Sequence, residues 1–440
     1  MNEQRMMVRA IPMLVAAAFS GYAGAAGFQL LEQNASGLGN SYAGSAAVAE
    51  NASTIYFNPA GMTQLQAHEF SVGLAGVNAS FKFSNSGSQT GALSGTGNDG
   101  DAGGWGYPPN AYLSWALSKD LYLGLGIGAP FGLKTEYDNP WIGAAQSRKF
   151  EITTMNINPS IAFRVNEMLS LGLGVSWQTL EAEYIRTVGI VSPLTASTAT
   201  LNLEDDAWGW NIGALFNVSP TTKIGVSYRS TIKYEATGDI QVTGPSATVN
   251  RAGSSSAKAD IKLPDTFILS ATQVLNDRWE MLGDVSWTGW SSIPKVDIVR
   301  TSNTNLFVPG VVGQASGGTA QTLDTAFEDT WRVALGANYK LDDAWKLKFG
   351  IAYDQTPVPD AERRLVSLPD NDRTWFSAGA QWKPNKTSAL DFGLAYLYLQ
   401  DSDINNNQNN ATNPAASRGL VKGSYEASVW ILGAQYSMAF

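Results

Sequence analysis

The chain ends in the sequence VWILGAQYSMAF (residues 429–440), which alternates between two kinds of side chain and decides the fold. In a β-strand, a period of two places each kind on its own face. The large apolar set suits a lipid-facing surface, and the smaller, more polar set suits a wet lumen. This segment therefore predicts a strand of a transmembrane β-barrel. One parity carries Trp430, Leu432, Ala434, Tyr436, Met438 and Phe440, and the other carries Val429, Ile431, Gly433, Gln435, Ser437 and Ala439.

The same alternation recurs along the chain, for example from Leu169 to Trp177 and from Trp331 to Tyr339. It predicts an all-β membrane fold, a 14-stranded antiparallel transmembrane β-barrel. A soluble β-sandwich would explain one such strand. It would not explain a pattern repeated along the chain and preceded by the export signal that is described below. The expected strands lie near residues 67–83, 108–117, 119–129, 148–165, 168–186, 205–218, 221–239, 258–275, 278–298, 323–340, 343–355, 371–383, 387–400 and 422–440.

The connections between these strands fall into two classes. Tight turns such as 118–120 and 219–221 alternate with long stretches rich in Gly, Asn, Ser, Thr or Pro, such as 84–107, 130–147 and 401–421. Short turns face the periplasm and long loops face outside in outer-membrane barrels. An even number of strands then places both termini on the periplasmic side.

The N-terminus has the three regions of a secretory signal peptide. Arg5 and Arg9 form a basic region, residues 11–19 form a short apolar core, and AGA at residues 23–25 supplies a cleavage pattern of small residues. The apolar core is too short to span a bilayer as a helix. We therefore expect a signal peptide over residues 1–25 and a mature protein in the outer membrane of a bacterium.

The composition fits a barrel and excludes several other classes. With no Cys and a single His, the chain has no usual ligand set for zinc, so we expect neither a metal nor another cofactor. The net charge of −9 argues against nucleic-acid binding. A mean hydropathy of −0.12 together with 11% aromatic residues is expected where only alternate residues touch lipid.

A barrel of this size needs something to close its lumen. Eight strands can be filled by side chains, whereas sixteen or more leave an aqueous channel. The mature chain offers residues 26–66 before the first strand, a segment rich in Gly, Ala, Ser and Asn. We expect this segment to pack in the lumen as a hatch, and residues 67–440 to form the barrel.

Ten short motifs are distributed over the mature chain. They are GFQL (27–30), SGLG (36–39), YAG (42–44), NPAG (58–61), PFGLKTEY (130–137), NINPS (156–160), LPDT (263–266), WTGWS (287–291), DTWR (329–332) and YDQTP (353–357). In this order they resemble the FadL family of long-chain fatty acid transporters, which also contains TodX-type aromatic hydrocarbon channels. The resemblance implies a 14-stranded barrel, an N-terminal hatch, an outer binding groove and an inner hydrophobic pocket. It also implies a kink in the third strand that opens the wall sideways into the membrane.

Several residues acquire candidate roles from this resemblance. Phe28 matches a hatch position near the family's inner pocket, although it could equally be a packed structural aromatic. Asn58, Pro59 and Ala60 match a hatch motif. By its sequence alone, Asn58-Pro59 indicates a turn.

Glycines occupy one face of the expected third strand at Gly124, Gly126 and Gly128. Glycine in a strand can mark a bend, or it can leave the wall bare so that a ligand or the hatch backbone approaches closely. A nucleotide-binding loop does not fit, because no helix pattern follows. We include the three glycines among the candidate ligand-binding residues.

A fatty acid carries a carboxylate, which a dry pocket must pair with a cation or another donor. Strand parity points several cations inward, and we nominate Arg332 and Lys348 as candidate ligand-binding residues. Inward acids such as Asp284 and Asp391 could pair with these cations instead. The sequence leaves fatty acids and uncharged hydrocarbons open as ligands.

These features predict a passive, ligand-gated channel for hydrophobic compounds, with long-chain fatty acids first and aromatic or aliphatic hydrocarbons as the alternative. We expect capture at the outer loops, transfer to the inner pocket and lateral exit near the third strand, by a monomer in contact with outer-membrane lipids. A general porin should lack a long hatch, and an adhesin would not need one. Catalysis is not expected, because His68 is predicted at the periplasmic end and no nucleophile motif or phosphate loop accompanies it.

Overall fold

The computed structural model describes residues 27–91, 97–188, 197–303, 315–412 and 416–440, and the predicted signal peptide lies outside them. The helices are short: η1 (Leu38–Asn40), α2 (Thr54–Phe57), η2 (Pro59–Gln64), α3 (Ala247–Gly253) and η4 (Trp290–Ser292). No helix among these residues is both long and apolar enough to cross a membrane. The strands are β1 (His68–Asn85), β2 (Gly100–Asp101), β3 (Gly104–Gly106), β4 (Pro109–Ala116), β5 (Leu121–Gly128), β6 (Gly132–Glu136), β7 (Lys149–Arg164), β8 (Leu169–Val188), β9 (Ser197–Ser219), β10 (Thr222–Arg229), β11 (Ile232–Thr243), β12 (Ser255–Leu263), β13 (Thr266–Val274), β14 (Trp279–Thr288), β15 (Val296–Arg300), β16 (Thr319–Leu323), β17 (Thr330–Lys340), β18 (Trp345–Asp354), β19 (Arg373–Trp382), β20 (Ser388–Leu399), β21 (Ser402–Asn407) and β22 (Leu420–Ala439).

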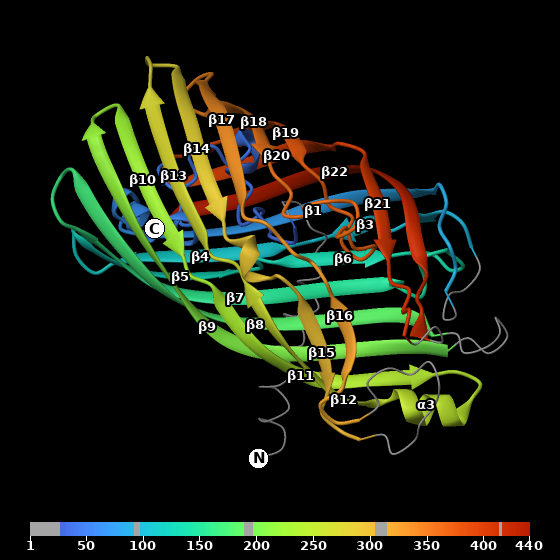
Figure 1. The fold of residues 1–440 in the computed structure, drawn as a ribbon. Coiled ribbons are helices and arrows are strands. Elements are labelled where there is room, and N and C mark those ends of the chain that lie inside the picture. Colours follow the sequence, from blue (N-terminus) through green and yellow to red (C-terminus); the bar gives the residue numbers. More distant parts are fainter. Residues whose placement is uncertain (1–26, 92–96, 189–196, 304–314, 413–415) are drawn as a thin grey trace.

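The strands form one closed antiparallel barrel (Figure 1). Antiparallel neighbours follow one another until the first strand meets the last, from Glu69↔Ala439 to Asn85↔Gly423, and this pairing closes the wall. The predicted 14-stranded barrel is confirmed. Its fourteen wall strands are β1, β4, β5, β7, β8, β9, β10 with β11, β12 with β13, β14 with β15, β16 with β17, β18, β19, β20 and β22.

Four strands that were expected to be continuous are each interrupted once. The interruptions are aligned across the wall, because Arg229, Thr266, Thr288 and Thr330 are successive cross-strand partners beside them. Pro264, which has no N–H to donate to a ladder, stands in one of the gaps. Figure 1 shows β11, β12, β15 and β16 bending away from β10, β13 and β14. The corrected strands are 221–239, 258–275, 278–298 and 323–340, which the structure divides as β10 and β11, β12 and β13, β14 and β15, and β16 and β17.

Three of the expected long loops contain strands that alternation did not predict. β2 and β3 lie within 84–107 and pair with β1. β6 lies within 130–147 and pairs with β7. β21 lies within 401–421 and pairs with β22. Both pairs extend the wall beyond the length of a membrane crossing, which takes about 9–11 residues.

The predicted faces of the last strand are confirmed. Trp430, Leu432 and Phe440 are each about half exposed on the outside, whereas Ile431 and Gln435 are buried on the inside. Ten residues of tilted strand cover roughly 25 Å along the membrane normal, the height of an apolar band. Exposed aromatic residues lie toward both ends of the band: Trp105, Tyr107, Trp208, Trp210, Trp331 and Tyr398 toward the loops, and Trp115, Trp279, Trp345, Trp382 and Phe440 toward the turns.

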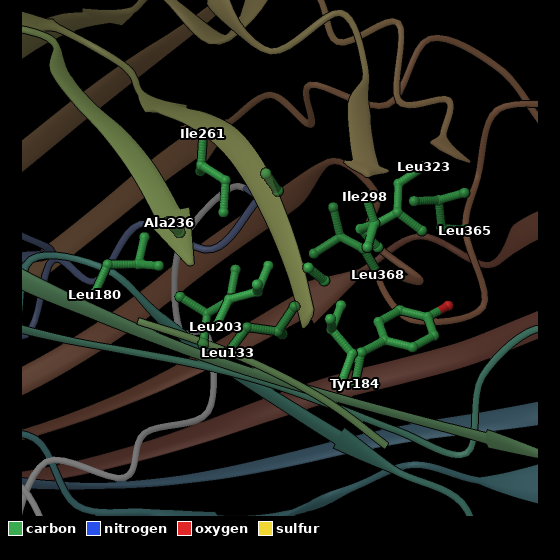
Figure 2. Packing of buried hydrophobic residues seen from close by; sticks show 14 of the residues in the cluster. Leu133, Leu180, Tyr184, Leu203, Ala236, Ile261, Ile298, Leu323, Leu365 and Leu368 are labelled. Carbon is green, nitrogen blue, oxygen red and sulfur yellow. The ribbon is translucent and has the colours of Figure 1, made fainter. Parts of the chain in front are cut away.

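Beyond the lipid-facing band, the two faces of the wall exchange roles. In β9, Trp208 and Trp210 face outward, whereas Leu201 and Leu203, nearer the loops, are buried inside and Glu204 is exposed outside. A strand surrounded by water buries its apolar face inward, while a strand in lipid can expose it. The inward side chains of this outer part pack into a large apolar cluster, and Figure 2 shows Leu180, Leu203, Ala236, Ile261, Ile298 and Leu323 converging there from six strands.

Candidate functional site

Residues 27–65, called the hatch from here on, lie inside the barrel against glycine positions of the wall (Figure 1). A Cβ atom added to Gly225 would lie 2.0 Å from the Ala46 carbonyl oxygen, and one added to Gly350 would lie 2.1 Å from the Asn40 carbonyl carbon. Any side chain at these positions would displace the hatch backbone. Contacts below 3.0 Å with the hatch backbone also occur at Gly172 and Gly379, and contacts below 3.0 Å with hatch side chains occur at Gly213, Gly393 and Gly433. Glycines from β8, β9, β10, β18, β19, β20 and β22 therefore fit the wall to the hatch on most sides of the lumen.

The nominated glycines of the third strand also face the hatch. A Cβ atom at Gly124 would lie 2.6 Å from Met62 Sδ, and one at Gly126 would lie 3.3 Å from Ile55 Cγ2. The bare face of β5 therefore receives hatch side chains, whereas the sequence led us to expect a ligand or the hatch backbone there. Ligand passage along Gly124, Gly126 and Gly128 stays a prediction.

Asn58 holds the middle of the hatch to the wall. Its amide nitrogen donates to the carbonyls of Ala46 (2.7 Å) and Ala214 (2.9 Å), the latter in β9. Its Oδ1 accepts from the backbone N–H of Ala60 (3.1 Å), and Pro59 opens η2. This is the N-cap arrangement that Asn followed by Pro favours. The motif Asn58-Pro59-Ala60 thus forms a turn whose capping side chain also anchors the hatch.

The third wall strand is interrupted between β5 and β6. β5 pairs with β4 as far as Ile127, and the described ladder of β6 is with β7. At the interruption the wall backbone pairs with the hatch: Leu30 N donates to Pro130 O (2.8 Å), and Gly132 N donates to Phe28 O (2.9 Å). The beginning of the hatch therefore lies where a neighbouring wall strand would otherwise pair. The resemblance implies a kink in this strand, and the strand is interrupted here; a sideways opening of the wall stays a prediction.

Phe28 is buried in an aromatic cluster beside this break. Its ring lies 5.9 Å from Phe131 and 4.9 Å from Trp290, and Trp290 lies 5.9 Å from Phe327, all measured between ring centroids. Gly27 packs so closely on Trp290 that an added Cβ would lie 2.7 Å from the indole ring. Phe28 thus occupies the apolar interior that the outer strands share, next to the break. Direct ligand contact by Phe28 stays a prediction.

Lys348 lies in an ionic cluster that joins the hatch to the wall. Its ammonium is 1% exposed and bonds to Glu50, to Asp391 Oδ1 (3.0 Å) and to the Ser36 carbonyl (2.8 Å). Lys346 reaches the other oxygen of Glu50 at 3.0 Å. Two lysines thus hold one hatch carboxylate, and Lys348 also uses its remaining donors.

Arg332 is placed differently, because it lines a cavity inside the barrel. The cavity contains about 630 Å³ of unfilled space, part of it open to solvent. The Arg332 guanidinium donates to the Ser41 carbonyl (2.6 Å) and lies 5.1 Å from the Trp375 ring. Hydroxyl groups and a second arginine share the lining, which includes Gln29, Tyr56, Ser227, Arg229, Thr266, Thr288 and Thr330.

These surroundings predict opposite results for the two nominated cations. Lys348→Met should destabilise the protein by about 3–5 kcal/mol, because it leaves the buried Asp391 without a cation and Glu50 with Lys346 alone, and it should reduce oleate and toluene uptake alike. Arg332→Met should weaken oleate binding and spare toluene if Arg332 contacts a ligand carboxylate. Thermal unfolding and binding titrations with both ligands measure this. A loss specific to oleate in the Lys348 variant would contradict the structural role.

A second cavity lies at the loop end of the barrel, above the lipid-facing band. It contains about 570 Å³ of unfilled space, part of it open to solvent, and lies within the apolar cluster of Figure 2. Most of its lining is aliphatic, from β8, β9, β11, β15, β16 and α3. Its polar lining consists of Tyr184, Arg186, Arg300 and Gln321.

Arg186 is the charged group of this outer cavity that carries an open donor. Its Nη1 atom is buried without a hydrogen-bond partner. Burial lowers the pKa of Arg186, and the nearby Arg418 and Arg300 guanidiniums lower it further. An arginine nevertheless stays charged in a protein at neutral pH. A cation with an unused donor in an apolar cavity is a site for the anionic end of an amphiphile.

Strand parity led us to nominate Arg332 and Lys348 but not the arginines of the outer cavity, Arg186 and Arg300. The parity of β8 could have identified Arg186. Arg186 has the same parity in β8 as Gly172, Gly174 and Ser176, the small residues that alternate with the apolar side chains from Leu169 to Trp177. Arg300 lies two residues beyond the expected end of its strand at residue 298. No alternation pattern could identify Gln321, because its orientation depends on an irregularity in the β15–β16 ladder.

His68 lies at the turn end of β1, against Trp115 (ring centroids 3.9 Å apart) and Phe440 (5.9 Å). This environment is that of a packed structural side chain at the end of the strand. Within the described residues, no group of three or more His, Cys, Asp or Glu side chains could hold a metal ion.

Comparison with known proteins extends over the whole chain. The family model described as outer membrane protein transport protein (OMPP1/FadL/TodX) matches residues 16–440. The chain is 32% identical over 440 residues to outer membrane protein P1 of Haemophilus influenzae, with 90% of each chain covered. It is 27% identical over 466 residues to a long-chain fatty acid transport protein of Salmonella typhi, with 100% of each covered.

Solved structures with the same fold include two that cover nearly the whole barrel. A Pseudomonas aeruginosa FadL homologue superposes with a TM-score of 0.83 at 20% identity, covering 94% of this chain and 99% of its own. The toluene transporter TodX of P. putida superposes with a TM-score of 0.69 at 15% identity, covering 92% and 98%. At these identities the superpositions support the fold alone.

Proposed function

Because this chain belongs to the OMPP1/FadL/TodX family of outer-membrane transport proteins, we propose that it is a passive, ligand-gated channel for long-chain fatty acids. At the coarser level, it is an outer-membrane transporter of hydrophobic compounds. In our proposal the acid is captured outside, held in the outer cavity, and released sideways into the membrane by a monomer surrounded by outer-membrane lipids. The process runs down a gradient and needs no catalytic step.

The observation that carries this proposal is the position of Arg186. Its unpartnered Nη1 lies in a cavity lined otherwise mostly by aliphatic side chains such as Val188, Leu201 and Ile298. An alkyl chain gains about 0.8 kcal/mol for each methylene that it buries, and a carboxylate at the guanidinium satisfies the open donor. A cavity for an uncharged hydrocarbon would need no cation. The long-chain fatty acid transport protein of S. typhi supports the same substrate class.

Replacing Arg186 with Met tests the assignment. The variant keeps the volume of the side chain and removes its charge, so oleate affinity should fall about ten- to hundredfold, the value of one charge-assisted hydrogen bond. Toluene and alkane binding should not change. Titration of both ligands against the purified barrel measures the two affinities.

The control for this variant is Arg251→Met, which removes an exposed arginine from the nearby α3. It should leave oleate binding unchanged, because this guanidinium is not part of the cavity lining. Oleate affinity that is unaffected in the Arg186 variant would argue against a fatty acid carboxylate at this site. It would favour the alternative, a channel for aromatic or aliphatic hydrocarbons.

The break between β5 and β6 supports the lateral part of the proposal. At this place the wall is hydrogen-bonded to the first residues of the hatch, and not to β4. A rearrangement of Phe28 to Leu30 would free the backbone at Pro130 and Gly132 without opening the ladders on either side. Such a local change could be triggered by a ligand that displaces Phe28 from the aromatic cluster, which would make the opening ligand-gated.

A further inference from the structure

The outer part of the wall is open along one edge of β16. Among the described strands, β16 forms a ladder with β15 alone. Along its other edge lies a groove, called the edge groove from here on, between residues 319–322 on one side and residues 362–365 and 405–412 on the other. It contains about 1500 Å³ of unfilled space, part of it open to solvent. Consecutive residues of β16 line it, as expected for a space along the edge of a strand.

The contacts that span the edge groove are weaker than a ladder. The Arg418 guanidinium donates to the Ala320 carbonyl (3.3 Å), and Arg363 forms an ion pair with Asp324 (3.4 Å). Both members of the ion pair are exposed, so the pair contributes little stability. The edge groove can therefore widen without the loss of a strand pairing.

One layer of side chains separates the edge groove from the outer cavity. Ala320 and Gln321 line both spaces. Leu365 lines the edge groove and also packs in the apolar cluster of Figure 2, to which Leu323 belongs. A ligand in the edge groove is thus separated from the outer cavity by the bulged part of β16 and not by a continuous wall.

Gln321 is the side chain of this layer that can move most easily. Along the β15–β16 ladder, Val299 pairs with Thr319 and Ile298 pairs with Gln321, so Ala320 is the extra residue of a β-bulge. The bulge directs Gln321 inward, where its Nε2 atom is buried and has no hydrogen-bond partner within the described part of the chain. Rotation of the amide toward the groove breaks no hydrogen bond at Nε2 and lets this nitrogen donate to water.

We infer that the edge groove is the entrance through which a long-chain amphiphile reaches the outer cavity, and that Gln321 closes the passage between the two spaces. The inference rests on the proposed function, since it assigns an entry path to the acid that the outer cavity holds. The groove is lined mostly by amide, hydroxyl and charged side chains, so an alkyl chain gains little burial there. It is a place of passage, whereas the aliphatic outer cavity is the place of rest.

An entrance changes rates and leaves the equilibrium alone. A barrier on the only path between the free and bound states slows association and dissociation by the same factor, so Kd does not change. A residue that contacts the resting ligand changes Kd instead, chiefly through the dissociation rate. This difference separates the edge groove from the outer cavity in one kinetic experiment.

A label placed in the edge groove tests the path. The chain has no cysteine, so Asn409→Cys introduces a single thiol at an exposed position of the groove lining. The full-length mature variant in lipid nanodiscs is coupled to a polyethylene glycol maleimide, and binding of a fluorescent long-chain fatty acid is followed by stopped flow. Both rate constants should fall about tenfold or more, with Kd unchanged. The control Asn202→Cys carries the same label on the exposed outer face of β9 and should bind as the unlabelled protein does.

Truncation of Gln321 should have the opposite effect. Gln321→Ala leaves a permanent opening between the two spaces, so both rate constants should rise several-fold and Kd should change less than either. Gln241→Ala makes the same substitution on the exposed face of β11, away from the lining of both spaces, and should change neither rate.

The outcomes separate this inference from the proposed function. Rate constants that the label at position 409 leaves unchanged would overturn the inference and leave the fatty acid channel intact. A label that weakens Kd without slowing association would also overturn it, because the edge groove would then be part of the resting site. Oleate affinity that does not depend on Arg186 would overturn the proposed function itself, whatever the label does.

Discussion

Deleting residues 26–63 should convert the protein into an open pore whose single-channel conductance is far above that of the full-length chain. The hatch contacts glycines of β8, β9, β10, β18, β19, β20 and β22, and it is the segment that fills the lumen of the described barrel. The wall should fold without it, because the ladders nearer the turns run around the barrel without interruption and close through β1 and β22. Planar bilayer recording of the refolded deletion protein measures the effect.

The control for the deletion keeps the hatch and weakens one anchor. Asn58→Ala removes the hydrogen bonds to Ala46, Ala214 and Ala60 at a cost of about 1–3 kcal/mol, and it should raise conductance only in brief events. The heat-dependent gel mobility of both variants verifies that the barrel is folded. Conductance that does not change on deletion would show that residues 26–63 do not plug the lumen.

Replacing Gly126 with Trp should block uptake of hydrophobic ligands and leave their capture at the outer cavity intact. An added Cβ at Gly126 already lies 3.1 Å from the Tyr112 ring and 3.3 Å from Ile55, so an indole there would push these side chains aside and crowd the region beside the break in the third strand. The expected size of this effect follows from the free-energy cost of the alternative route, which passes through the aqueous periplasm. A chain of sixteen methylenes that crossed the aqueous periplasm would forfeit roughly 13 kcal/mol of burial, so blocking a lateral exit should be close to complete.

Two further variants distinguish a lateral exit from an axial one. Gly283→Trp makes the same substitution on the outer face of β14, where an added Cβ has open space, and it should transport normally. Ala43→Cys combined with Gly336→Cys places two Cβ atoms about 3.1 Å apart, close enough for a crosslink between hatch and wall in a chain that has no other cysteine. A lateral route should survive this crosslink, because it leaves Phe28 to Leu30 free. Normal uptake by Gly126→Trp together with a block by the crosslink would indicate an axial path through a moving hatch.

The amino-acid sequence by itself determined the barrel, because a period of two is a local property of each strand. Side-chain size and polarity along residues 429–440 specify which face meets lipid, and the structure places Trp430, Leu432 and Phe440 there. The lengths of the connections predicted that tight turns and long loops alternate along the chain. The inward direction of Arg332 and Lys348 follows from the same parity, and both side chains are buried within the wall.

Tertiary structure decided what these inward residues meet. The sequence could not show that Lys348 is held by Glu50 and Asp391, because three segments far apart along the chain bring those groups together. Nor could it show that the backbone at Pro130 leaves the wall and pairs with Leu30, since any backbone can form that ladder and only the fold chooses the partner.

The outer cavity is the clearest case of a feature that tertiary structure alone decides. Above the membrane the solvent outside the wall changes from lipid to water, so the apolar face of β8 and β9 turns inward and encloses Arg186. A single bulge at Ala320 then reverses the parity of Gln321 and points its amide into the same space. Periodicity predicts the direction of a side chain only as long as the ladder is regular, and here the ladder is irregular where the site is built.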